Sequence, residues 1–173
     1  MSPLVSIHDS PFTIHGSEKM SQTQSQGGRR IAVRRSNIHG RGVFALTKIR
    51  KGERVIEYTG ERVSHDEADR RYPADDSTHT MLFIVDDEIV IDATRVGSSA
   101  RWINHSCRPN CESVDDEGRI YIEAVRDIPP GEELTYDYNL ILDEPHTPAA
   151  KRENPCYCGE KRCRGTLLGS KQP

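Results

Sequence analysis

Hydrophobic residues in the middle of the chain occur in short runs separated by charged or turn-forming residues. This pattern favours β-strands over helices. We predict strands over residues 31–34, 43–46, 54–58, 82–85, 89–91, 112–114 and 120–124. Residues 86–87 and 115–118 are rich in Asp and lie between neighbouring runs, where we expect hairpin turns. The chain is therefore predicted to be mainly β.

Helical signals are few, and the composition changes near both ends. Ser64 and Glu67 form a capping-box pattern, which predicts a short helix over residues 64–71. Residues 1–28 are rich in Ser, Gln and Gly without apolar periodicity, so we predict a disordered tail. Residues 141–153 contain two prolines and are predicted to be a linker.

The length of 173 residues suits one folded domain, and the charge is unevenly distributed. Residues 29–71 carry 12 Lys and Arg against 6 Asp and Glu, whereas residues 72–150 carry 5 against 17. The acidic block could attract a basic partner or be an ordinary solvated surface, and charge alone favours the second explanation. No long apolar run predicts a membrane span, and no basic stripe with aromatic residues predicts direct nucleic-acid binding.

Residues 101–110 and 133–138 suit neither an ordinary strand nor an ordinary helix. They nevertheless hold an amide at Asn104, an imidazole at His105, a thiol at Cys107 and phenols at Tyr136 and Tyr138. We interpret this concentration of reactive groups as a reaction site. The simpler alternatives are a buried hydrogen-bonded pair for the amide and imidazole, and ordinary packing for the phenols.

The five cysteines are an odd number and lie in the second half of the chain, at positions 107, 111, 156, 158 and 163. This arrangement favours metal binding in a reducing compartment over a secreted disulfide framework. The spacing Cys-x-Cys-x₄-Cys over residues 156–163 is not that of a zinc finger, so spacing alone leaves zinc and free thiols equally open.

Four motifs in order resemble those of SET-domain protein lysine methyltransferases. They are Gly40-x-Gly42, Tyr58-x-Gly60, the run over residues 101–110 and the run over residues 133–138. Residues 83–94 and 156–163 look most like the trithorax-type branch with its post-SET cysteine segment. The resemblance implies a SET-type fold of several small sheets over residues 29–140, with short helices and a C-terminal pseudoknot, and a zinc-binding post-SET segment over residues 154–170.

The resemblance also implies the site residues. Cofactor binding, to S-adenosylmethionine, is expected at Arg41, Gly42, Arg101, Asn104, His105 and Tyr138. Catalytic roles are expected for Tyr138, Tyr58 and Tyr136. Zinc is expected at Cys107, Cys156, Cys158 and Cys163, with Cys111 left as a free thiol.

The implied reaction is methyl transfer to the ε-amine of a lysine. Tyr136 lies at a position where the family carries Phe or Tyr, and its hydroxyl predicts that methylation stops at the mono- or dimethyl state. The chain departs from the family at Met81, where a tyrosine is common, and at Trp102, where phenylalanine is usual.

The expected substrate is a basic, lysine-containing protein or peptide such as a histone. Because the basic runs are too sparse for a nuclear localisation signal, we expect a cytosolic protein, or a chromatin-associated one in a eukaryote. The competing hypothesis is a zinc-stabilised SET-like module that binds peptides with little turnover.

Overall fold

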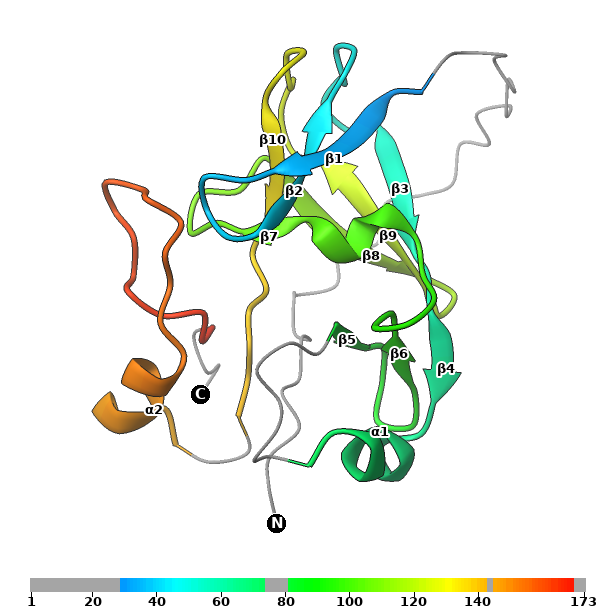
Figure 1. The fold of residues 1–173 in the computed structure, drawn as a ribbon, viewed down its shortest axis with the longest axis vertical. Coiled ribbons are helices and arrows are strands. Elements are labelled where there is room, and N and C mark those ends of the chain that lie inside the picture. Colours follow the sequence, from blue (N-terminus) through cyan, green and yellow to red (C-terminus); the bar gives the residue numbers. More distant parts are fainter. Residues whose placement is uncertain (1–28, 74–80, 143–144, 170–173) are drawn as a thin grey trace.

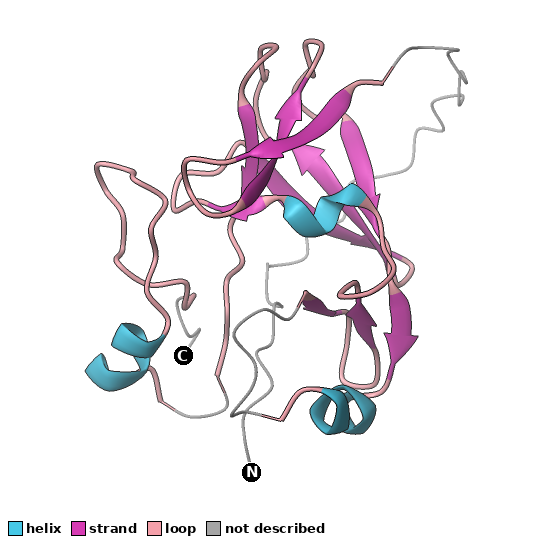
Figure 2. Ribbon diagram, viewed as in Figure 1, coloured by secondary structure: helices cyan, strands magenta, loops and turns pink. Residues whose placement is uncertain are grey.

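The computed structural model describes residues 29–73, 81–142 and 145–169 (Figure 1). These residues form three small β-sheets joined by long loops, with few and short helices (Figure 2). The prediction of a mainly β protein is confirmed. The tail predicted over residues 1–28 lies outside the described residues. No helix in the described ranges is long and apolar enough to cross a membrane.

The first sheet has the order β1-β2-β10-β7. Its strands are β1 (Ile31–Arg35), β2 (Arg41–Ala45), β10 (Glu133–Tyr136) and β7 (Asn104–His105). Strand β10 pairs antiparallel with β2 and parallel with β7. A strand close to the C-terminal part of the chain is thus inserted between two segments that precede it in the sequence.

The other two sheets have three strands each, and the β4-β6-β5 sheet lies below the first sheet in Figure 1. One has the order β3-β9-β8, from β3 (Arg54–Tyr58), β9 (Arg119–Ala124) and β8 (Cys111–Asp116). The other has the order β4-β6-β5, from β4 (Glu61–Val63), β6 (Val90–Asp92) and β5 (Leu82–Ile84). Both predicted hairpins exist, and the β8–β9 turn is tight because Glu117 and Gly118 take positive φ angles.

Among the described residues, three short helices complete the fold. Helix α1 (His65–Arg71) begins after Ser64, whose side chain accepts a hydrogen bond from the backbone N–H of Glu67, as the capping pattern predicted. The 3-10 helix η2 (Ser99–Trp102) leads directly to β7. Helix α2 (Pro148–Glu153) lies within the stretch predicted to be a linker.

The main hydrophobic core lies where the first two sheets meet. Val43 and Leu134 from the first sheet and Ile120 and Ile122 from the second are almost completely buried. Tyr58, Phe83 and Tyr136 belong to the same cluster. The core therefore includes two aromatic residues of the predicted site, Tyr58 and Tyr136, and close packing holds them in place.

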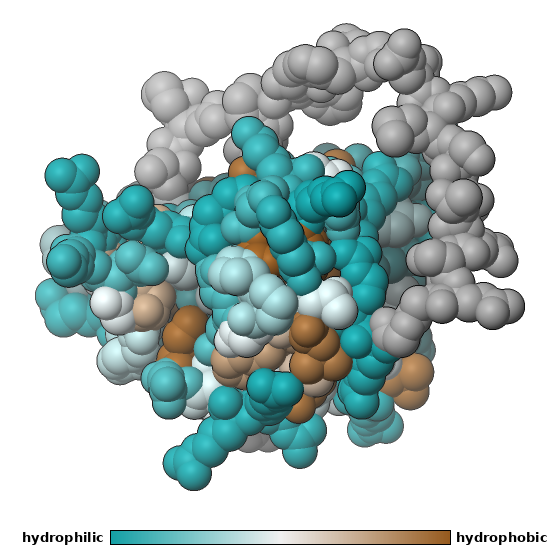
Figure 3. Space-filling model, turned by 90° about the horizontal axis from the view of Figure 1, so that it is seen from above, coloured by the Kyte–Doolittle hydropathy of each residue, from teal (hydrophilic) through white to brown (hydrophobic). Residues whose placement is uncertain are grey.

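Seen from above, the surface is mainly hydrophilic, with hydrophobic residues visible only in small patches (Figure 3). Among the described residues, the large hydrophobic side chains that are most exposed are Val96 and Tyr157. Single exposed side chains of this kind are common on globular proteins and need no special explanation.

Candidate functional site

The parallel pairing of β7 with β10 brings the two chemically unusual segments together. Asn104 lies opposite Thr135, and His105 lies opposite Tyr136. Just beyond β10, the hydroxyl of Tyr138 donates a hydrogen bond of 2.9 Å to the carbonyl of Ile103. The expectation that neither segment forms a strand is wrong, because each supplies a short strand whose partner is distant in sequence. The expected meeting of these segments is observed.

Aromatic rings gather around this junction. The ring centroids of Tyr136 and Tyr138 are 5.0 Å apart, and those of Tyr58 and Phe83 are 5.2 Å apart. The Tyr58 hydroxyl donates to the backbone carbonyl of Met81 at 3.2 Å. Because this acceptor belongs to the backbone, replacing the usual tyrosine by Met81 leaves the anchor of Tyr58 in place.

The three phenols are held in their neutral form. Burial raises the pKa of Tyr58, Tyr136 and Tyr138, and electrostatic repulsion between neighbouring phenolates raises the pKa of Tyr58 and Tyr136 further. They can therefore orient a substrate and donate hydrogen bonds at neutral pH, but a phenolate is not available as a resident base.

Asn104 is held by a hydrogen-bond network that starts at the N-terminal sheet. Its amide nitrogen donates to the carbonyls of His39 and Arg41 and to Oε1 of Glu133, at 3.2, 2.8 and 2.8 Å. Ser36 donates to both carboxylate oxygens of Glu133. Both amide hydrogens of Asn104 are thus used inside the protein, so binding the amino-acid end of a cofactor through them would require one of these contacts to open.

Gly42 gives Glu133 the space it needs. A Cβ atom at this position would lie far inside contact distance of Glu133 Oε1 and 3.1 Å from Ser36 Cβ. Gly42→Ala should therefore displace the Glu133 carboxylate and disrupt its hydrogen bonds. We expect a loss of stability on the order of 2 kcal/mol, measured by chemical denaturation.

A double-mutant cycle isolates this contact from other effects of the added methyl group. If the cost arises from Glu133, Gly42→Ala should cost much less in a Glu133→Ala background than in the unmodified protein. An equal cost in both backgrounds would assign the effect to the backbone at Gly42 instead.

Two arginines expected to bind the cofactor stack on the indole of Trp102. The guanidinium carbons of Arg41 and Arg101 lie 4.8 and 5.1 Å from the ring centroid. Arg101 also donates to the carbonyl of Ala93 at 2.8 Å, and among the described residues its Nε is the one buried side-chain polar atom without a hydrogen-bond partner. No described carboxylate forms an ion pair with Arg41, so its charge fits a ligand that carries a carboxylate.

Four cysteines expected to bind zinc meet beside this site. The Sγ atoms of Cys107, Cys156, Cys158 and Cys163 all lie within 4.8 Å of one another, and Cys107 Sγ is 3.7 and 3.8 Å from those of Cys156 and Cys163. A tetrahedral zinc ion with Zn–S bonds of about 2.3 Å separates its sulfur ligands by about 3.8 Å. The cluster thus has the ligands and the spacing that zinc requires.

The thiols differ in acidity when no cation is considered. Burial raises the pKa of Cys107, whereas backbone hydrogen bonds from Cys107 and Glu160 outweigh burial at Cys158 and lower its pKa to about 7. Cys111 lies outside the cluster, fully buried in β8, where burial raises its pKa to about 12 and keeps the thiol unreactive.

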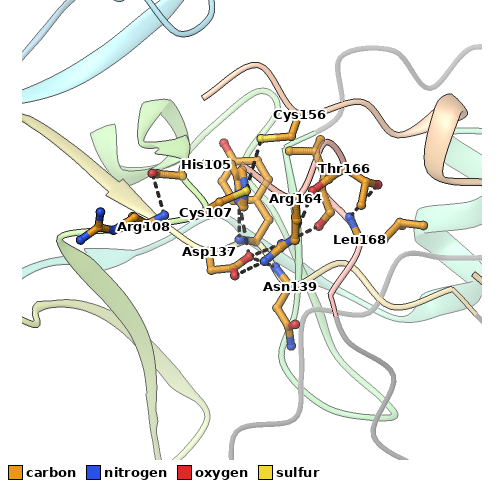
Figure 4. Close-up of polar contacts among 12 residues, drawn as sticks. His105, Cys107, Arg108, Asp137, Asn139, Cys156, Arg164, Thr166 and Leu168 are labelled. Atoms are coloured by element: carbon orange, nitrogen blue, oxygen red, sulfur yellow. Dashed lines mark hydrogen bonds and ion pairs between the residues drawn. The ribbon is translucent and has the colours of Figure 1, made fainter. Parts of the chain in front are cut away.

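A second link fastens the cysteine segment to the centre of the site (Figure 4). Arg164 forms a bidentate ion pair with Asp137 at 2.5 and 2.6 Å and donates to the carbonyls of Thr166 and Leu167. Burial works against ionisation of Asp137, but the hydrogen bonds from Arg164 hold its pKa below the usual range. Asp137 directly precedes Tyr138, so the ion pair acts next to a predicted catalytic residue.

Four residues that support the candidate site were not predicted as site residues: Ser36, Glu133, Asp137 and Arg164. Glu133 and Asp137 were visible only as members of a motif. Ser36 carried no signal at all, because its partner Glu133 lies 97 positions away. For Arg164, its position directly after Cys163 was the available hint.

The small sheets, the paired central and C-terminal segments and the four-cysteine cluster together define a SET-type domain. The SET domain family matches residues 40–139, and the chain belongs to this family. The resemblance to its trithorax-type branch is confirmed by three relatives. Histone-lysine N-methyltransferase TRX1 of Oryza sativa subsp. japonica is 44% identical over 158 residues, which are 87% of this chain and 15% of the relative.

The other two relatives are animal proteins. Histone-lysine N-methyltransferase trithorax of Drosophila virilis is 46% identical over 79% of this chain and 4% of the relative. Histone-lysine N-methyltransferase 2B of Homo sapiens is 44% identical over 79% of this chain and 5% of the relative. The chain thus spans a small fraction of the length of these proteins.

Proposed function

We propose that this chain is a protein-lysine N-methyltransferase that uses S-adenosylmethionine and transfers one or two methyl groups to a lysine of a basic protein. The observation that carries the proposal is the convergence of Asn104-His105 with Tyr136 and Tyr138 through the β7–β10 pairing. The names of the relatives, which are histone-lysine methyltransferases, support the same activity.

The donor would supply an electrophilic methyl group. We assign the side chains of Arg41 and Arg101 to its carboxylate. Arg41 has no ion-pair partner among the described residues, and Arg101 has a buried Nε without a hydrogen bond. Gly42, Asn104 and His105 would contribute mainly through their backbone, since Asn104 already uses its amide hydrogens inside the protein.

The lysine must reach the site as a neutral amine. A free lysine side chain has a pKa of about 10.4 and is mostly protonated at pH 7. Buried, neutral phenols from Tyr58, Tyr136 and Tyr138 disfavour an ammonium ion through desolvation and can orient the nitrogen by hydrogen bonds. Because these phenols remain protonated, we assign the released proton to solvent.

The acidic block over residues 72–150 is partly paired with arginines of the same chain. Asp92 pairs with Arg71, Glu123 with Arg54, and Asp137 with Arg164. Part of the negative charge is therefore neutralised within the protein. The proposal of a histone-like substrate rests on the relatives, which are histone-lysine methyltransferases. They also lead us to propose chromatin as the place of action in preference to the cytosol.

The activity is tested by incubating the full chain with tritiated methyl donor and a panel of basic proteins and peptides. We expect label in a lysine-containing substrate, and no label when the target lysine is replaced by arginine. Peptide binding without methyl incorporation would instead support the alternative of a peptide-binding module.

The final methylation state depends on Tyr136 in this proposal. Its side chain is buried beside Tyr138, where a hydroxyl takes up space that a further methyl group would need. Tyr136→Phe should shift the products from mono- and dimethyl-lysine towards trimethyl-lysine, measured by mass spectrometry of a substrate peptide. An unchanged product distribution would count against this role. Tyr121→Phe is the matched control, because the ring of Tyr121 lies against the guanidinium groups of Arg54 and Arg119.

A further inference from the structure

The imidazole of His105 lies beside Cys107 of the four-cysteine cluster (Figure 4) and also contacts Tyr138. Its Nε2 is 3.4 Å from Cys107 Sγ, and its Nδ1 is 3.1 Å from the backbone nitrogen of Tyr138. The ring is buried and packs edge-on against the Tyr138 ring, with centroids 5.4 Å apart. Family resemblance assigned His105 to cofactor binding, which leaves this side chain without a role.

The hydrogen bonds determine the tautomer of the ring. The backbone N–H of Tyr138 points at Nδ1, so Nδ1 must accept and cannot carry a hydrogen. Asp137 Oδ1 is also 3.4 Å from Nδ1, but this carboxylate is already engaged by Arg164. The ring hydrogen therefore resides on Nε2 and is directed at the sulfur of Cys107.

We propose that His105 is a positioning residue that couples the metal site to Tyr138. Its Nε2–H donates to the thiolate of Cys107 when zinc is bound, while Nδ1 fixes the backbone N–H of Tyr138. Partners of this kind around a metal ligand orient the ligand and strengthen metal binding. The inference rests on the proposed function only for its consequence in catalysis, since the contacts themselves need neither donor nor substrate.

Two substitutions separate the two ends of the ring. In His105→Asn, the side-chain oxygen can replace Nδ1 as acceptor, but no donor reaches Cys107. In His105→Gln, the amide nitrogen can replace Nε2 as donor, but no acceptor remains beside Tyr138. Both variants keep the ion pair between Arg164 and Asp137, so effects of that link cancel in the comparison.

Zinc affinity is measured by competition with a chromophoric chelator, and the Tyr138 amide by hydrogen exchange in NMR. His105→Asn should bind zinc about tenfold more weakly with near-normal exchange at Tyr138. His105→Gln should bind zinc almost normally, with exchange at Tyr138 up to about tenfold faster. Chelation should accelerate Tyr138 exchange more in the unmodified protein than in His105→Asn.

Equal effects of the two variants on both measurements would overturn the coupling and leave only a packing role. If either variant fails to fold, the proposal can be tested on the unmodified zinc-bound protein. The ¹⁵N chemical shifts of labelled histidine then report which tautomer His105 adopts. The proposal requires the Nε2–H tautomer, and the Nδ1–H tautomer would exclude it. A protein that passes these tests but transfers no methyl group would contradict the proposed function alone.

Discussion

Tyr138→Phe is expected to reduce methyl transfer by about 10²–10⁴-fold while the protein remains folded. The hydroxyl that this substitution removes donates to the Ile103 carbonyl, one residue before Asn104. The ring would keep its contacts with Tyr136 and His105, so the loss concerns one hydrogen bond and the group that we place against the substrate amine.

The test combines initial rates of methyl incorporation with thermal unfolding. We expect a change in stability on the order of 1 kcal/mol, too small to explain the loss in rate. Tyr121→Phe again provides the control, because this ring lies in β9 between Arg54 and Arg119 and should show an unchanged rate. A Tyr138→Phe variant as active as the unmodified protein would remove the catalytic assignment.

Removal of the metal should reduce methyl transfer by about 100-fold and release the C-terminal segment while the β-sheets persist. Residues 154–169 bury few apolar side chains, chiefly Leu168, and are held by the four cysteines, by Arg164 and by a short bridge between Leu140 and Leu168. Structural zinc sites contribute apparent binding free energies of about 10–16 kcal/mol, far more than these remaining contacts.

Chelation can be followed by activity and by hydrogen exchange in parallel. We expect a rate loss of about 100-fold, because displacement of a positioned group by about 1 Å can cost that much. Exchange should accelerate over residues 154–169 and remain slow in β3, β8 and β9, and added zinc should restore both signals. Uniform loss of protection would show instead that the metal supports the whole domain.

Sequence patterns predicted the strands whose hydrophobic residues alternate locally. The strand over residues 54–58 has the predicted bounds, and helix α1 begins at the predicted cap. Strands β7 and β10 were not predicted, because Asn104 and His105 are polar and their pairing partners lie about 30 positions away. Helix α2 was missed because two prolines suggested a linker, although Thr147 before Pro148 is a typical start signal.

The candidate site could be located from its motifs, but its support could not. The four cysteines that were expected to share a metal do lie together, since three of them are close in sequence and the fourth lies in the central motif. The hydrogen bonds that Ser36 and Asn104 donate to Glu133 depend on the assembled sheet. Contacts that join three distant segments produce no repeating sequence pattern within any one segment, so they cannot be predicted from local patterns.

The cysteine cluster takes one ligand from residue 107 and three from residues 156–163. A ribosome must therefore synthesise the chain through Cys163 before all four sulfurs are present, by which time β8, β9 and β10 have already been made. The sheets can form on the nascent chain, whereas the metal centre and the contacts around Tyr138 can be completed only afterwards. The four-sulfur site is therefore completed after the strands that it supports have been synthesised.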